Sequence, residues 1–190
     1  MGDIIEAIEN IVGTQGLLRG DDVRARPNAS WGAGSCPALA IVRPADTAEV
    51  SAVLALCHEQ DQPVVPLGGL TGLVNGISCA EGDIGLSLER MRQIEHIDPE
   101  AGTMVVQAGA VLQTIQEAAR DAGWMFGVDF GARGTANIGG MISTNAGGNS
   151  VLRYGMTREQ VLGLEVVLAD GTVLSSMNDM LKNNTGYDLK

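Results

Sequence analysis

Two glycine-rich stretches decide how this chain folds: PLGGLTGL at residues 66–73 and DFGARGTANIGG at residues 129–140. Adjacent glycines let successive backbone N–H groups converge into a concave nest that can hold a phosphate oxygen, and Thr71 adds a hydroxyl donor. In the second stretch small residues and polar donors almost exclude bulky side chains, as expected where backbone packs along an extended polar ligand. The pair favours one ligand that is long enough to touch both stretches.

Neither stretch matches the best-known nucleotide-binding loops. Residues 66–73 lack the Gly-Lys-Ser/Thr ending of a Walker loop, and they lack the Gly-x-Gly-x-x-Gly of a dinucleotide-binding Rossmann fold. An NAD-dependent Rossmann dehydrogenase is also disfavoured because strands and helices alternate only weakly along the chain. Two simpler interpretations stay open, a tight turn without a ligand at residues 66–73 and a loop that braces two lobes at residues 129–148.

Hydrophobic periodicity predicts a first lobe over about residues 38–90. A short apolar strand at residues 38–43 precedes a helix that begins after Asp46, with a glutamate three residues later as in a capping box. A second buried strand at residues 63–67 leads directly into the first glycine stretch, and a further strand is expected at residues 84–88. This order predicts a βαβ-like unit.

A second, more antiparallel lobe is expected over residues 91–190. A hairpin is predicted for residues 94–107, an amphipathic helix for residues 111–119, and another hairpin for residues 161–174 around Asp170-Gly171. We therefore expect strands to dominate this half of the chain. Before both lobes, residues 1–37 should form a short amphipathic helix and then an extended surface segment that stays outside the core.

Composition limits the class of protein. The 190 residues carry a net charge of −11, which opposes binding to nucleic acid, and no apolar run is long enough to span a bilayer. Cys36, Cys57 and Cys79 form no closely spaced pair, so the sequence predicts neither a disulfide framework nor a metal site. We expect reduced thiols and a cytoplasmic protein.

Six stretches together carry a family resemblance: residues 66–72, 129–140, 144–148, 153–155, 161–171 and 184–189. With them the chain resembles, from about residue 38 to residue 190, the FAD-binding domain of the vanillyl-alcohol oxidase and p-cresol methylhydroxylase (PCMH) flavoproteins. The matching branch contains D-lactate, glycolate and D-2-hydroxyglutarate dehydrogenases. The resemblance implies an α+β fold, a two-lobed PCMH-type FAD-binding domain that is incomplete at the C-terminus, with the cofactor in the cleft between lobes.

The resemblance implies FAD as the cofactor, held noncovalently, because His58 and His96 are interpreted as structural residues rather than attachment points. Gly68, Gly69 and Thr71 would hold the pyrophosphate, and a valine at Gly69 would then lower FAD content more than stability. The sequence departs from the family pattern at two positions. Leu67 stands where the family usually has an arginine, and Leu70 stands where it usually has glycine or asparagine. The implied cofactor-binding residues are Pro66, Gly68, Gly69, Leu70, Thr71, Gly72, Gly131, Ala132, Gly134, Thr135, Ile138, Gly139, Gly140, Thr144, Asn145, Ala146 and Gly147.

The resemblance implies oxidation of a D-2-hydroxy acid to the 2-oxo acid, with a separate electron acceptor and a second copy of the chain as a candidate partner. The catalytic residues are unknown: Arg133, Arg153, Lys182 and Tyr187 are candidates by type only. We expect the base and the carboxylate clamp beyond Lys190, and apolar surface or open edges on residues 161–174.

A noncatalytic nucleotide-binding or scaffold module is the alternative, and it would keep the glycine stretches without redox chemistry. The enolpyruvyl-sugar reductase of cell-wall synthesis shares the broad fold but lacks the context of residues 145–148.

Overall fold

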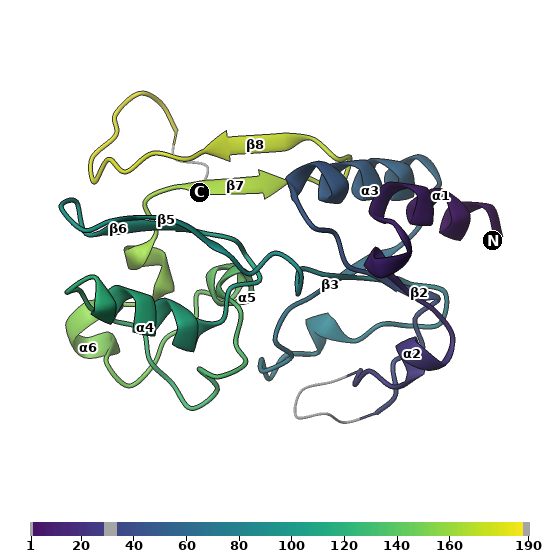
Figure 1. Ribbon diagram of the computed structural model, residues 1–190, viewed down its shortest axis with the longest axis horizontal. Coiled ribbons are helices and arrows are strands. Elements are labelled where there is room, and N and C mark those ends of the chain that lie inside the picture. Colours follow the sequence, from purple (N-terminus) through teal and green to yellow (C-terminus); the bar gives the residue numbers. More distant parts are fainter. Residues whose placement is uncertain (1, 29–33, 188–190) are drawn as a thin grey trace.

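The computed structural model describes residues 2–28 and 34–187, which fold into two lobes lying side by side (Figure 1). A four-stranded mixed sheet in the order β1-β2-β4-β3 forms the centre of the first lobe. Strands β2, β4 and β3 are parallel, and β1 adds an antiparallel edge. The strands are β1 (Leu17–Leu18), β2 (Ala40–Val42), β3 (Val64–Leu67) and β4 (Ile84–Ser87). The predicted strand, helix, strand order is confirmed.

Helices α1 (Gly2–Val12) and α3 (Thr47–Glu59) cover one face of this sheet (Figure 1). The backbone N–H of Glu49 donates to the side chain of Asp46 at 2.8 Å, so the predicted cap of α3 is present. Because side chains alternate along a strand, Ala40 and Val42 pack toward these helices. No helix within residues 2–28 and 34–187 is long and apolar enough to cross a membrane.

Part of the segment before β2 packs on the other face of the sheet. This segment forms η1 (Thr14–Gly16), strand β1 and helix α2 (Asp21–Arg24). Val23 and Cys36 are buried against Ile41 of β2. The expectation that residues 15–36 stay outside the core is therefore wrong, because isolated apolar residues in a polar segment leave no period to detect.

The second lobe combines a hairpin with short helices around its own core. Strand β5 (Ile94–Asp98) pairs antiparallel with β6 (Thr103–Val106), as predicted. Its helices are α4 (Leu112–Asp121), α5 (Ile138–Ser143) and α6 (Val151–Tyr154), followed by the single turn η4 (Thr157–Gln160). A similar single turn, η3 (Asn75–Ile77), belongs to the first lobe. The expectation that strands dominate this half is wrong, because the glycine-rich sequence after residue 137 forms helical turns.

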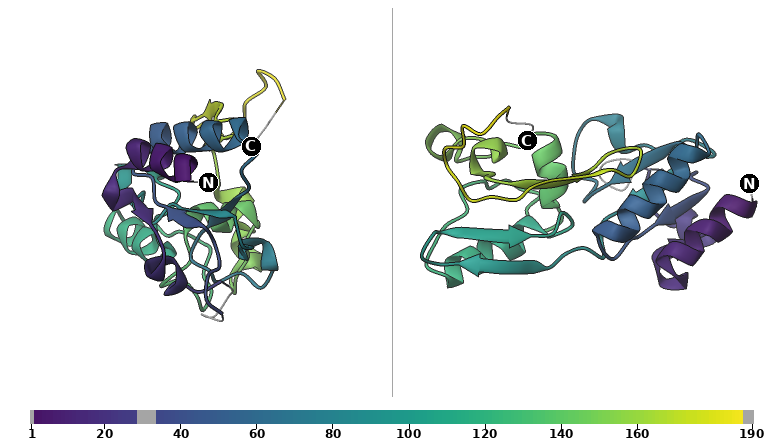
Figure 2. Two further views of the ribbon diagram at one scale, coloured as in Figure 1. Left: turned by 90° about the vertical axis from the view of Figure 1, so that its right-hand side faces the viewer. Right: turned by 90° about the horizontal axis from the view of Figure 1, so that it is seen from above.

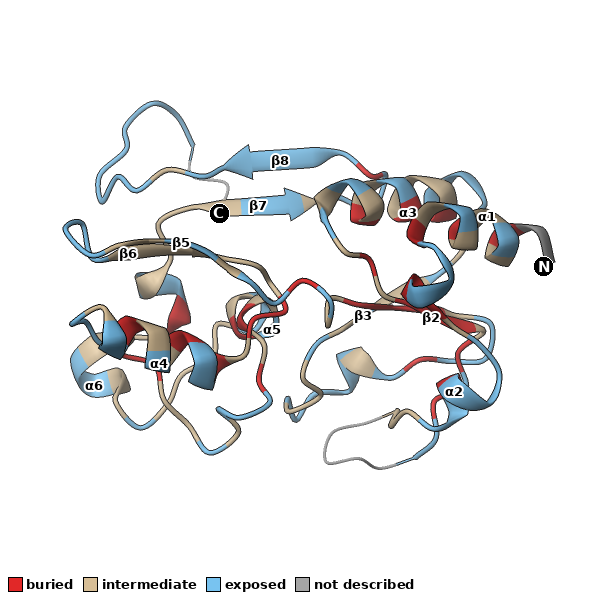
Figure 3. Ribbon diagram, in the orientation of Figure 1, coloured by how far each residue is buried: buried red, intermediate tan, exposed pale blue. Residues whose placement is uncertain are grey.

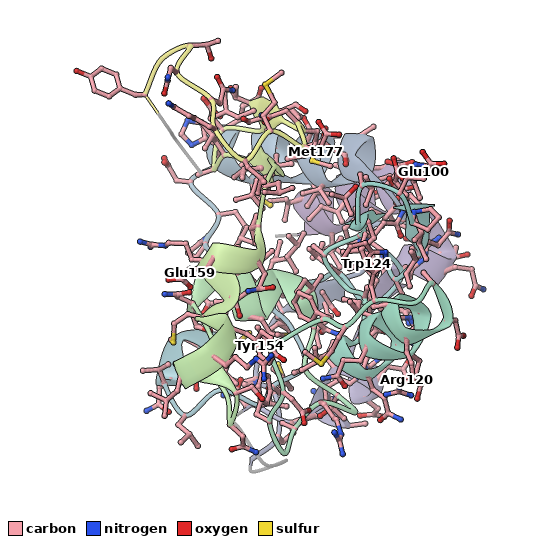
Figure 4. All side chains as sticks on the ribbon, turned by 90° about the vertical axis from the view of Figure 1, so that its left-hand side faces the viewer. Glu100, Arg120, Trp124, Tyr154, Glu159 and Met177 are labelled. Carbon is pink, nitrogen blue, oxygen red and sulfur yellow. The ribbon has the colours of Figure 1, made fainter. Side chains whose placement is uncertain are left out.

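Aromatic side chains of the second lobe lie on glycines. A Cβ on Gly102 would stand 3.0 Å from ring atoms of Trp124, whose indole N–H donates to the carbonyl of Pro99 at 2.8 Å. The ring of Tyr154 packs on Gly127 in the same way. Figure 4 looks onto this end of the molecule, with both rings labelled. Each glycine removes a methyl group that the ring would otherwise meet.

Strands β7 (Leu164–Val167) and β8 (Val173–Ser176) form the second predicted hairpin, which reaches from the second lobe over α3 of the first (Figure 2). The hydroxyl of Ser51 donates to the carbonyl of Gly171 at 2.6 Å, and that of Thr47 donates to Glu165 at 2.7 Å. Along its whole length β8 is exposed (Figure 3). Val166, Leu168, Val173 and Leu174 are 40–43% exposed, so the apolar surface expected here is confirmed.

A half-buried carboxylate, Glu89, ties the segment before residue 28 to the end of β4. Arg26 donates to both carboxylate oxygens, with Nη1 at 3.0 Å and Nη2 at 2.9 Å, and Arg43 donates to one of them at 3.1 Å. Burial opposes ionisation, but the hydrogen bonds and charges of both guanidinium groups outweigh it and hold the pKa of Glu89 below its usual range. The clamp places residues 26–28 beside the first glycine stretch.

Glu89→Gln should destabilise the fold by about 1 kcal/mol at neutral pH, because it removes the charge that both arginines share. A group with a lowered folded-state pKa stabilises fully above its unfolded pKa, and that contribution is lost as the pH falls through the folded value. The deficit should therefore shrink in acid. Urea unfolding of both proteins at neutral and acidic pH measures this, with Glu81→Gln, an exposed carboxylate, as the control. A deficit that is constant across pH would contradict it.

Candidate functional site

The two glycine stretches meet where the lobes touch. A Cβ on Gly69 would overlap the carbonyl oxygen of Thr135 and would stand 2.8 Å from its carbonyl carbon and 3.1 Å from Cα of Ala136. A Cβ on Gly68 would lie 3.7 Å from Oδ1 of Asn137. The expectation that these stretches approach each other across the molecule, despite their separation in sequence, is confirmed.

A pocket of about 370 Å³ opens at this junction. Both stretches line it, together with one residue of the segment that Glu89 holds, and none of its lining side chains is ionisable. The lining residues are Pro27, Gly69, Leu70, Thr71, Gly131, Ala132 and Thr135. Six of these seven are among the residues predicted from the sequence to bind the cofactor. Pro27 was missed, since nothing in its polar surroundings indicates a ligand.

Local structure explains why these residues reach the pocket. Strand β3 ends at Leu67, so the parallel part of the sheet delivers the first stretch at its carboxyl edge, where open α/β sheets bind ligands. The second stretch folds as successive turns, in which Thr135 and Ala136 both donate to the carbonyl of Ala132, at 3.0 and 2.9 Å. These turns expose the backbone of Gly131 to the pocket.

Neutral donors are available in the pocket. The backbone N–H groups of residues 68–72, and those of Gly131 and Ala132, donate no hydrogen bond to any other described residue. The hydroxyl of Thr71 makes none with the described part of the chain either. Gly69, Leu70, Thr71, Gly131 and Ala132 line the pocket, and their free donors without a carboxylate among the lining residues suit a phosphate-bearing ligand. The residues present therefore fit the pyrophosphate of a dinucleotide.

The sequence suggested that Gly69 is glycine in order to form a phosphate nest, whereas the structure shows that a neighbouring backbone occupies the space of a side chain. Its missing side chain makes room for the backbone of Thr135, which cannot move aside as the end of a flexible side chain could. A valine here would separate the lobes, so stability and ligand binding would fall together. The structure thus argues against the expectation that Gly69→Val lowers FAD content more than it lowers stability.

Three predicted residues lie on helix α5. The side chain of Ile138 is buried in the core of the second lobe, and Gly139 packs against Ala108, with a Cβ at 2.9 Å from that methyl carbon. Only Gly140 leaves open space where a side chain would stand. For Ile138 and Gly139, packing within the lobe therefore accounts for the residue type without a ligand. Pro66 lies in β3, while Gly72 and Gly134 are exposed beside lining residues.

The remaining predicted residues, 144–147, follow α5 and do not line the pocket. Thr144 donates its hydroxyl to the carbonyl of Gly140 at 3.0 Å. Asn145 takes a left-handed conformation, with φ of 47°, and its Oδ1 accepts from the backbone of Arg158 at 2.9 Å. A Cβ on Gly147 would meet the sulfur of Met156 at 2.8 Å. Their contact with FAD stays a prediction.

No catalytic group is assembled among the described residues of the pocket. Arg133 forms an ion pair with Asp129 at 3.0 Å, and Arg153 lies 5.3 Å above a tyrosine ring. Lys182 and Tyr187 are exposed. Each of the four candidates by residue type thus has a structural or solvent-exposed position, and the pocket offers binding groups without a base.

Solved structures show which fold this is. The chain is similar to alkyldihydroxyacetonephosphate synthase, with a TM-score of 0.82 and 18% identity over 93% of this chain and 34% of that one. It is also similar to 6-hydroxy-D-nicotine oxidase from Arthrobacter nicotinovorans, with a TM-score of 0.72 and 22% identity over 83% of this chain and 34% of that one. The α+β fold predicted from the sequence is confirmed.

The family model described as "FAD binding domain" matches residues 38–176, and the chain belongs to that family. The resemblance to the vanillyl-alcohol oxidase and p-cresol methylhydroxylase flavoproteins is confirmed. The chain is 42% identical to D-2-hydroxyglutarate dehydrogenase, mitochondrial, of Bos taurus over 99% of its length and 35% of that protein. It is 46% identical to D-2-hydroxyglutarate dehydrogenase of Xanthomonas citri pv. viticola over 80% of its length and 32% of that protein. The chain thus spans about a third of these relatives.

Gly131→Val should weaken FAD binding by roughly tenfold or more and leave stability nearly unchanged, because bulk enters the pocket and a Cβ there meets no protein atom within 4 Å. Fluorescence titration with FAD and thermal unfolding measure the two effects. Gly76→Val is the matched control, since Gly76 is equally open but lies outside the pocket. Equal FAD affinity in both variants would contradict a ligand at Gly131.

Leu70→Asn should stabilise the protein by about 1 kcal/mol, because Leu70 has φ of 52°, a conformation that asparagine tolerates better than leucine. Denaturant unfolding measures the change. Leu73→Asn is the control: Leu73 is 83% exposed and its φ is not positive, so its stability should stay near that of the parent. A destabilised Leu70 variant would show that the leucine makes contacts that outweigh the strain.

Proposed function

We propose that this chain is the FAD-holding part of an oxidoreductase that converts a D-2-hydroxy acid, of the D-lactate, glycolate or D-2-hydroxyglutarate type, to the 2-oxo acid. One observation carries the proposal: glycine stretches from both lobes line a single pocket whose N–H groups have no described protein acceptor. The names of the relatives support the choice of substrate class.

In this proposal the N–H groups of residues 68–72 and the hydroxyl of Thr71 donate to the pyrophosphate, and residues 131–135 close the pocket from the other lobe. Residues 138–140 and 144–147 continue the site toward the flavin. When bound, FAD supplies the acceptor for the hydride from the substrate carbon. The division of the chain, with an FAD-binding domain from residue 38 and lobes that part near residue 90, belongs to the same proposal.

Noncovalent attachment is part of the proposal. His58 and His96 are exposed, and neither lines the pocket, so no histidine side chain of the described residues stands at the proposed site. A separate electron acceptor, a homodimer and a cytoplasmic location also remain proposals. The relatives from cattle and rice are named mitochondrial, so fractionation of the host cell is needed to test the location.

A noncatalytic nucleotide-binding module is the second candidate. The observation that favours it is the pocket lining, which contains backbone and small side chains without any ionisable group. Such a pocket can bind a dinucleotide but cannot by itself accept a proton from a substrate hydroxyl. The two candidates therefore agree on FAD binding and differ in whether the bound flavin is reduced by substrate.

A chimera separates them. The chain would replace the matching third of the bovine relative, and the purified protein would be tested for FAD content and for oxidation of D-2-hydroxyglutarate, D-lactate and glycolate with an artificial electron acceptor. We expect yellow protein, release of the flavin by acid precipitation, and oxidation of at least one of these three acids but not of L-2-hydroxyglutarate. FAD uptake without bleaching by any acid would favour the noncatalytic module, and colourless protein would overturn both.

A further inference from the structure

Two cysteines that lie far apart in sequence are neighbours in the first lobe. Cys36 and Cys79 are 2% and 5% exposed and belong to one buried cluster on the face of the sheet opposite α1 and α3. The side chain of Cys36 lies close enough to that of Cys79 to act on its pKa. The sequence spacing gave no indication of this pair, because 42 residues separate its members.

Hydrogen bonds to residues 26–28 hold the backbones of both cysteines in place. The N–H of Cys36 donates to the carbonyl of Arg26 at 2.9 Å. The side chain of Asn28 accepts from the N–H of Cys79 at 2.9 Å and donates to its carbonyl at 3.1 Å. Residues 26–28 thus bridge the two cysteines, and Pro27 within this bridge lines the pocket described above. Because one short segment holds both backbones, the two thiols stay in the same part of the cluster, as a disulfide requires.

We propose that Cys36 and Cys79 form a reversible disulfide under oxidising conditions, which fastens the residues just before β2 to the loop before β4. With hydrogen peroxide as the oxidant, one thiolate attacks a peroxide oxygen and becomes a sulfenic acid while water leaves after protonation. The second thiol then attacks that sulfur, and the sulfenic oxygen leaves as a second water. Two thiols and one peroxide give one disulfide and two waters.

The pKa of the attacking thiol controls the rate of this oxidation. Burial is the main reason that the pKa of Cys79 is raised to about 12, and Cys36 and Asp83 contribute in the same direction. Because the thiolate is the nucleophile, oxidation at neutral pH should be slow in the closed structure and faster at higher pH. The pair is therefore protected from mild oxidants and responds to strong or prolonged oxidation.

Cys57 provides an internal control. It is equally buried, at 1% exposed, but it lies in the core on the opposite face of the sheet, among α1 and α3. Burial raises its pKa to about 11, and no other cysteine of the described chain contributes to that shift. A reaction that merely followed burial would modify Cys57 as readily as the pair.

The test treats the native 190-residue chain with hydrogen peroxide, blocks the remaining thiols after denaturation, and digests it with a protease that cuts after glutamate. Cuts after Glu49, Glu59 and Glu81 place the three cysteines on three separate peptides. We expect the peptide that contains Cys36 to be linked to the one that contains Cys79, with Cys57 blocked as a free thiol. Dithiothreitol should reverse the link.

Variants make the result decisive. Cys57→Ser should still lose two thiols, whereas Cys36→Ser and Cys79→Ser should form no internal link, and the oxidised parent should melt roughly 5–15 °C above its reduced form. If a serine variant fails to fold, the digest of the unmutated chain still decides. Absence of the link after prolonged oxidation, or a link that includes Cys57, would overturn the proposal.

Discussion

Close backbone contact between the two lobes is the constraint on which the site depends. Gly69 lies against the carbonyl of Thr135, and Gly109 lies against the carbonyls of Leu88 and Met91, with its own N–H donating to Met91 at 2.8 Å. A side chain at either glycine would force the lobes apart. Because the pocket is lined from both lobes, its width depends on how closely these contacts bring the lobes together.

An acidic chain that binds a phosphate needs local neutrality. The net charge of −11 would repel an anion at long range, but salt screens such repulsion beyond about 10 Å. Among the described residues, only backbone, apolar groups and hydroxyl groups line the pocket. The nearby carboxylate, Glu89, is neutralised by Arg26 and Arg43. In the proposed site, binding by N–H groups instead of lysine would tolerate the overall charge and would depend little on pH.

Local patterns predicted most of the first lobe and both hairpins, because capping at Asp46, alternating strands and the Asp170-Gly171 turn are each encoded within a few residues. The pairing of residues 66–73 with 129–140 was also predictable from their shared composition. Contacts that depend on single residues were not. Val23 and Pro27 sit in a polar segment without a period, and only the folded chain shows why Gly69 must lack a side chain.

The same limit applies to the helices of the second lobe. Glycines at 139 and 140 argue against a helix by intrinsic propensity, yet α5 forms there because Ile138 and Met141 are buried in the core. Packing outweighs propensity in this segment. For the candidate cofactor residues, the glycine stretches and the family resemblance pointed to the pocket, but neither could separate residues that line it from residues that support it, such as Ile138.

The placement of aromatic rings gives the two lobes different spectroscopic signatures. Trp124, Phe126, Phe130 and Tyr154 all belong to the second lobe, whereas the described core of the first lobe is aliphatic with three thiols. A Trp31→Phe variant leaves Trp124 as the one tryptophan of the sequence, so its near-ultraviolet circular dichroism should report chiefly on packing in the second lobe, and thiol accessibility on opening of the first. Each lobe can then be followed on its own, even though the glycine contacts hold the lobes together.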